Sequence, residues 1–134
     1  MSISVLHRCP ACGFEIEAWD DGHPYIRDDR GRARFYYHPC ETEVRQKILS
    51  VCEWAHDKSP EDLSALLEKK SGNMTEFLCL GCCRRFKCDE DRQQPRCRKR
   101  GSKDVRDVML LGGCACPKCG KGRFPDEPPF YAIS

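Results

Sequence analysis

The chain has 134 residues, of which 40% are hydrophobic and 33% are charged, with a formal net charge of +2. This length suits one domain or two very small ones, and the thin apolar supply disfavours an enzyme with a large pocket. No apolar run approaches the roughly 20 residues of a membrane helix, so we expect no membrane partner.

Cysteine occupies 12 of the 134 positions, far above ordinary usage. The stretch Met1 to Arg8 lacks a basic segment followed by an apolar one, so we expect no secretory signal. The expected location is therefore the reducing cytoplasm, where thiols are metal ligands more often than disulfides. The composition favours a scaffold held together by metal.

Short strands are expected in the first part of the chain. Phe14, Ile16 and Ala18 alternate with acidic residues, which predicts a half-buried strand. A hairpin is predicted over residues 25–37, with its turn at Asp28-Asp29-Arg30-Gly31.

Two helices are expected next. In residues 41–56 the apolar positions recur at spacings of three and four, which predicts one helix. A second helix is predicted from Ser59-Pro60, a capping residue followed by a favoured first residue, to residues 71–73. Cys52 lies on the apolar stripe of the first helix, so we expect a core residue there and not a ligand.

The last part of the chain is expected to contain strands again. Residues 77–78 and 85–87 predict strands on either side of a turn, and Phe77 and Phe86 are expected in their core. Val105, Val108 and Leu110 suggest a further strand. Residues 125–129 are too rich in proline for regular structure.

Three Cys-x-x-Cys pairs carry the strongest chemical signal in the sequence. In such a knuckle a tight turn aims both thiolates at one point, and backbone N–H groups stabilise their charge. Two knuckles together supply the four thiolates that zinc takes in a closed structural site. The first, second and last knuckles are Cys9-Pro-Ala-Cys12-Gly13, Cys79-Leu-Gly-Cys82 and Cys116-Pro-Lys-Cys119-Gly120.

A fourth pair is half missing, and we refer to it as the half knuckle. Cys97-Arg-Lys-Arg100-Gly101 has the outline of a knuckle, but Arg100 stands where the second cysteine belongs. A guanidinium stays protonated and cannot bind zinc. Another cysteine, such as Cys83, Cys88 or Cys114, is needed to complete the site.

The segment from Phe77 to Val105, with its second knuckle and half knuckle, resembles the zinc-ribbon superfamily. It is most similar to small bacterial ribbons of the regulatory-protein type with Cys-Pro-x-Cys-Gly knuckles. The resemblance covers about residues 77–124 and the first knuckle, and leaves out the two helices. The resemblance implies structural zinc and does not assign an activity. From the number of knuckles we expect two zinc ions.

A weaker similarity joins the first knuckle and the residues up to Pro24 to the rubredoxins. Their second knuckle also has the Cys-Pro-x-Cys-Gly form of the last knuckle here. Because four thiolates hold iron or zinc with the same geometry, iron is the alternative metal.

Three pairings of the knuckles stay open. The first unites the second knuckle with the half knuckle, and the first knuckle with the last. The second unites the first and second knuckles, and leaves the half knuckle with the last one. The third closes the first knuckle locally through His38 and Cys40. The expected ligands are Cys9, Cys12, Cys79, Cys82, Cys97, Cys116 and Cys119, with His38, Cys40, Cys88 and Cys114 as further candidates.

Positive charge is concentrated in one segment. Residues 79–106 contain ten Lys or Arg and four acidic residues, a net charge of +6. Such a segment is either a solvated face or a surface for phosphates. The residues next to the knuckles are the candidates for nucleic-acid contact: Arg84, Arg85, Arg98 and Lys99.

No enzyme signature is present. A zinc deaminase needs His-x-Glu ahead of Pro-Cys-x-x-Cys, and a thioredoxin-like site needs a helix at its second cysteine. We therefore expect a non-catalytic zinc-binding ribbon protein, an adaptor or regulatory module that contacts protein or nucleic acid. A rubredoxin-like electron carrier is the alternative.

The expected fold class is α+β, a small metal-stabilised domain. Zinc-ribbon hairpins form its head and tail, and two helices lie between them. The segments are residues 1–40, 41–72 and 73–134, with the first and the third expected to form one compact unit.

Overall fold

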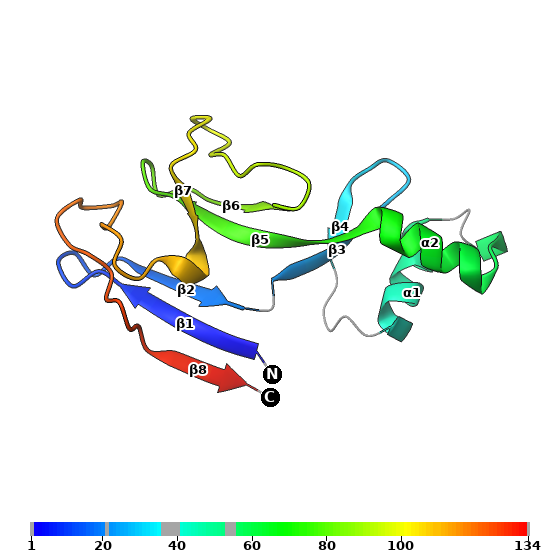
Figure 1. Ribbon diagram of the computed structural model, residues 1–134, viewed down its shortest axis with the longest axis horizontal. Helices are drawn as coiled ribbons and strands as arrows, with labels where there is room; N and C mark the ends of the chain where they lie inside the picture. Colours follow the sequence, from blue (N-terminus) through cyan, green and yellow to red (C-terminus); the bar gives the residue numbers. More distant parts are fainter. Residues whose placement is uncertain (1, 21, 36–40, 53–55, 134) are drawn as a thin grey trace. The chain divides into compact units, whose positions relative to one another are not determined.

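The computed structural model describes residues 2–20, 22–35, 41–52 and 56–133 (Figure 1). It is a mixed α/β structure with antiparallel sheets and two helices, as the sequence predicted. The chain forms two compact units. Unit 1 contains residues 1–22 and 75–134, and unit 2 contains residues 23–74. Unit 2 is thus an insertion in the sequence of unit 1.

Unit 1 contains a three-stranded sheet in the order β2-β1-β8 (Figure 1). Its strands are β1 (Ser2–Arg8), β2 (Glu15–Trp19) and β8 (Phe130–Ile133), and β1 is antiparallel to both neighbours. Strand β2 is the strand predicted from alternation, since Ile16 and Ala18 are buried and Glu15, Glu17 and Trp19 are exposed. Strands β1 and β8 were not predicted.

Three other strands of unit 1 position the second knuckle. The second half of β5 (Ser71–Cys79) pairs with β6 (Arg85–Cys88) on one side and with β7 (Val105–Asp107) on the other. Phe77 and Phe86 lie opposite each other, and their buried rings stack with centroids 5.8 Å apart. The two predicted strands and their aromatic core are confirmed.

The strand predicted over residues 105–110 is only half correct. Strand β7 ends at Asp107, and a short 3-10 helix, η2 (Val108–Leu110), follows. The Asp107 carboxylate accepts a hydrogen bond from the backbone N–H of Met109 at 2.9 Å. Such local capping by Asp competes with strand pairing and turns the chain.

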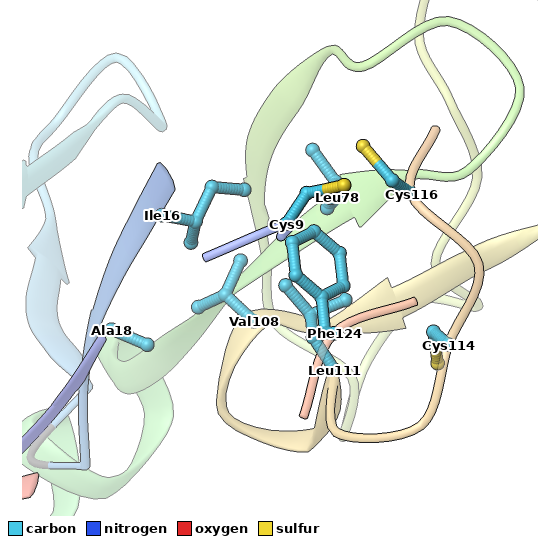
Figure 2. Close-up of a cluster of buried hydrophobic side chains, with 9 residues drawn as sticks. All are labelled: Cys9, Ile16, Ala18, Leu78, Val108, Leu111, Cys114, Cys116 and Phe124. Atoms are coloured by element: carbon cyan, nitrogen blue, oxygen red, sulfur yellow. The ribbon is translucent and has the colours of Figure 1, made fainter. Parts of the chain in front are cut away.

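The core of unit 1 mixes aliphatic side chains with thiols. Figure 2 shows its nine buried residues, in which Cys9 and Cys116 lie among Leu78 and Phe124. Phe14 and Leu80 pack against this cluster from the side. The first and last knuckles therefore each contribute a buried cysteine to the core.

Unit 2 begins with the predicted hairpin, β3 (His23–Arg27) and β4 (Ala33–Phe35). The Asp28 carboxylate closes the turn by accepting the N–H groups of Arg30 and Arg32, both at 2.9 Å. Strand β3 also pairs with the first half of β5. Residues 36–37 of the predicted hairpin lie outside the described residues.

Both predicted helices are present in unit 2, α1 (Glu41–Val51) and α2 (Pro60–Lys70), and both contact β3. Ser59 caps α2 by accepting the N–H of Asp62 at 3.2 Å. The end of α2 leads directly into β5. Cys52 is fully buried in the hydrophobic cluster of the helices, so the interpretation as a core residue is confirmed.

We predict that Cys52→Ser destabilises the protein without loss of metal. The thiol lies 3.7 Å from the carbonyl oxygen of Arg27 in an otherwise apolar cluster, so a hydroxyl there lacks a close partner. The free energy of unfolding should fall by about 1–3 kcal/mol. Ser64→Ala, on the exposed face of α2, should change it by less than about 0.5 kcal/mol. Loss of metal from Cys52→Ser would contradict the core role.

Candidate metal centres

All four knuckle sequences fold into the same backbone turn, including the half knuckle. In each turn the N–H of the fifth residue donates to the carbonyl of the first cysteine, at 2.6–3.0 Å. The fifth residue always has positive φ: Gly13 (80°), Cys83 (64°), Gly101 (67°) and Gly120 (70°). Glycine adopts this conformation without strain, whereas Cys83 does so at the position where the other turns have glycine. The turn therefore forms with arginine at position 100 as it does with cysteine at the equivalent position of the other knuckles.

The first centre unites the first and last knuckles. The Sγ atoms of Cys9, Cys12, Cys116 and Cys119 all lie within 4.8 Å of one another. The Cys9–Cys119 and Cys12–Cys116 sulfur pairs are each 3.7 Å apart. Thiolates placed tetrahedrally about 2.3 Å from zinc lie about 3.8 Å apart, whereas disulfide sulfurs lie about 2.05 Å apart. The four sulfurs thus form a set that fits a tetrahedral metal ion.

The second centre unites the second knuckle with the half knuckle. The Sγ atoms of Cys79, Cys82 and Cys97 lie within 4.8 Å of one another, and those of Cys82 and Cys97 are 3.6 Å apart. Both groupings correspond to the first of the three pairings considered from the sequence. The cysteine groups could hold two metal ions.

The further candidate ligands are not brought to either centre where the structure describes them. Cys88 is buried with its Sγ 3.8 Å from the carbonyl of Gln93, and Arg106 donates to Cys114 at 2.6 Å. Within the described residues, neither thiol belongs to a group with metal-ligand spacing. His38 and Cys40 lie outside the described residues.

Two thiols of the first centre, Cys119 and Cys12, have pKa values shifted in opposite directions. The backbone N–H groups of Gly122 and Lys121 lower the pKa of Cys119 to about 6. The N–H of Phe14 acts in the same direction on Cys12, but desolvation and the neighbouring thiols raise its pKa to about 11. Cys119 therefore forms a thiolate readily, whereas ionisation of the Cys12 thiol is opposed. A divalent cation bound to the sulfurs would favour the ionised form of both thiols.

The half knuckle uses its backbone in the same way. The N–H groups of Arg100 and Lys99 lower the pKa of Cys97 to about 7. Cys97 is buried and Cys82 is half-buried, so the centre has one face in the protein and one toward solvent. The backbone of the half knuckle is thus prepared for a thiolate although its second side chain is an arginine.

One residue essential to the first centre gave no signal in the sequence. A Cβ atom on Gly122 would lie 2.5 Å from the Sγ of Cys9 and 2.9 Å from the Cβ of Ala11. The Gly122 carbonyl also accepts the N–H of Cys116 at 2.8 Å. Only glycine lets the last knuckle approach the first this closely. Its position outside the Cys-Pro-x-Cys-Gly pattern explains why motif reading missed it.

The basic residues next to the knuckles have different environments. Arg84 and Lys99 are exposed, and Arg85 forms an ion pair with Glu76. Arg98 donates to the backbone carbonyl of Lys87 at 3.0 Å. Arg98 also lines a hollow of about 210 Å³ beside the half knuckle, whose polar walls are Lys87, Gln93, Gln94, Arg96 and Arg98.

Comparison of the chain with protein-family models, with curated proteins and with solved structures found no match. No helix among the described residues has the length and apolar character needed to cross a membrane. The site is therefore interpreted from its geometry alone. The paired knuckles suggest a structural, metal-binding role for the cysteine clusters.

We predict that Gly122→Ala removes metal from the first centre, because its methyl group would collide with Cys9. Bound metal, measured on the purified protein, should fall by about one equivalent. Gly31→Ala is the control for loss of a glycine away from the centres, since Gly31 has positive φ but a Cβ atom there would meet nothing within 4 Å. It should destabilise unit 2 by about 1 kcal/mol and keep all the metal. Full metal content in Gly122→Ala would refute this packing argument.

Proposed function

We propose that this protein is a zinc-ribbon-like, non-catalytic binding module that holds two structural zinc ions. The observation that carries the proposal is the arrangement of seven cysteines in two groups with the sulfur spacing of a tetrahedral thiolate site. None of the eleven cysteines in the described part of the chain forms a disulfide. Free thiols support the reducing cytoplasm as the location.

The first centre connects two distant segments of the chain, which favours a structural role. It connects the turn between β1 and β2 with the loop before β8, segments more than 100 positions apart in sequence. Its two buried cysteines belong to the main hydrophobic cluster of unit 1. Metal bound there would hold together a core that has few apolar residues of its own.

We predict that metal removal unfolds unit 1. Structural zinc contributes on the order of 10 kcal/mol to small ribbon domains, so a strong chelator should abolish the cooperative thermal transition of this unit. Calorimetry before and after chelation measures the change, and readdition of zinc should restore the transition. An unchanged transition in protein shown to be free of metal would exclude the structural role.

The partner favoured by the surface is a nucleic acid. The hollow beside the half knuckle has three cationic side chains and two amides among its lining residues and no carboxylate. Arg98, one of the lining residues, donates a hydrogen bond to the Lys87 carbonyl, and buried Phe86 forms part of the wall. A concave site of this charge fits phosphate groups better than an apolar protein anchor.

We predict salt-dependent binding of single-stranded oligonucleotides to this hollow. About three phosphate contacts give a slope of about −2 to −3 for log affinity against log salt. Arg96→Ala should reduce the slope by about 0.7–0.9, because one contact is lost. Arg30→Ala, an exposed cation in unit 2, should leave both affinity and slope unchanged. Equal loss in both variants, or no binding at low salt, would contradict this assignment.

An iron electron carrier is the second candidate, and the exposure of Cys12 favours it. The other three ligands of the first centre are buried or half-buried, so one sulfur faces solvent at the edge where an electron could leave. Metal analysis and the visible spectrum of untreated protein separate the candidates. Ferric tetrathiolate is red, whereas the zinc protein is colourless.

A further inference from the structure

The two centres differ at one ligand position, and the turn that carries this position is otherwise the same. The half knuckle keeps the backbone hydrogen bond from Gly101 to Cys97 and the positive φ of Gly101. Its N–H groups point at the Cys97 sulfur as in the complete knuckles. A side chain at position 100 is therefore presented as the second cysteine of a knuckle would be, but it is an arginine.

The side chain of Arg100 lies against the opposite knuckle. A Cβ atom on Gly81 would be 2.8 Å from Nη1 of Arg100 and 3.8 Å from Sγ of Cys79. The guanidinium and the thiol thus flank the same point of the second knuckle. Gly81 has no side chain, which leaves space for the guanidinium there.

This placement gives the second centre an unusual charge balance. A divalent ion with three thiolates carries a net charge of −1, which the adjacent guanidinium offsets. Four-coordinate zinc needs a fourth donor, and Arg100 cannot supply one. Among the described residues no other cysteine, histidine or carboxylate lies within ligand distance of the three sulfurs.

The side of the three sulfurs next to Gly81 and Arg100 faces solvent. Gly81 and Arg100 are exposed and Cys82 is half-buried, whereas Cys79 and Cys97 are buried. A metal ion held by these three sulfurs is thus covered on the protein side and open on the side of Arg100. Sites with three protein ligands and an open place bind exchangeable ligands.

We propose that the second centre is an open three-thiolate metal site that takes the thiolate of a small-molecule thiol as its exchangeable fourth ligand. This inference rests on the proposed function, since it requires metal at both centres. A thiolate is favoured because the ion already prefers sulfur donors, and because an anion is attracted by the adjacent guanidinium. The first centre, with four cysteines of the chain, takes no such ligand.

Cobalt substitution of the full chain tests this inference. The ligand-field bands of tetrahedral Co²⁺ shift when a thiolate replaces an oxygen donor, so each centre has its own spectrum. Wild-type protein with two Co²⁺ should show one tetrathiolate ion and one ion with a mixed donor set. Titration with 2-mercaptoethanol should convert the mixed ion, saturably, to a tetrathiolate, with no change in the amount of bound metal.

Three variants assign the response to residues. Arg100→Cys should show two tetrathiolate ions before any thiol is added. Cys97→Ser should lose the responsive ion and keep the other. Arg100→Ala should still respond but bind 2-mercaptoethanol about fivefold more weakly, since it lacks the nearby cation. Neutral imidazole, the comparison ligand, should bind Arg100→Ala and wild type equally well.

The failures are distinguishable. Binding of fewer than two Co²⁺ ions contradicts the proposed function itself. A second outcome is that untreated wild type contains two tetrathiolate ions that do not respond to 2-mercaptoethanol. This result overturns only the open site. The variant Cys40→Ser then tests whether the chain supplies the fourth sulfur. Formation of dimers on cobalt loading without added thiol would show that a cysteine of a second copy is the fourth ligand. This result also overturns the inference.

Discussion

Thiolates packed within 4.8 Å of one another repel, and the rest of unit 1 depends on how that repulsion is overcome. The backbone of each knuckle turns N–H groups toward the sulfurs, which makes the first ionisation at each centre easy. The next ionisation is opposed, because desolvation and the neighbouring thiols raise the pKa of Cys12. A metal cation bound by the sulfurs offsets the repulsion between thiolates and favours the second ionisation. In its absence buried Cys9 and Cys116 contribute only as small apolar groups.

Local patterns in the sequence were sufficient for much of the fold. Alternation around Ile16, the Ser59 cap and the apolar stripe that includes Cys52 predicted a strand and two helices that the structure contains. Each knuckle indicated two cysteines that could share a metal ion, since the turn geometry is encoded within five consecutive residues, whereas the pairing of the knuckles stayed open. These features share one property: the interactions that define them join residues close in sequence.

Features that depend on distant partners were not predictable. Strand β1 contains polar residues, and only its pairing with β2 and β8 on both sides makes it a strand. The requirement for glycine at position 122 arises from a contact with Cys9, far away in the sequence. Likewise, the sequence showed that Arg100 replaces a cysteine but not that its guanidinium lies against Gly81. The spacing of cysteines in the sequence identifies candidate metal ligands. The residues that shape the space around those ligands are identified only from contacts in the folded structure.

The two centres differ greatly in the length of chain that each encloses. Sulfurs paired across the first centre are 104 and 110 positions apart, whereas Cys82 and Cys97 are 15 positions apart. By the logarithmic dependence of loop closure on length, the longer loop has an entropic penalty about 1.7 kcal/mol larger. The second centre can therefore assemble early, from a segment that emerges from the ribosome as one piece. The four sulfurs of the first centre are complete only after the inserted unit 2 and the last knuckle have been synthesised, so the three sulfurs of the second centre come together from chain that is made earlier.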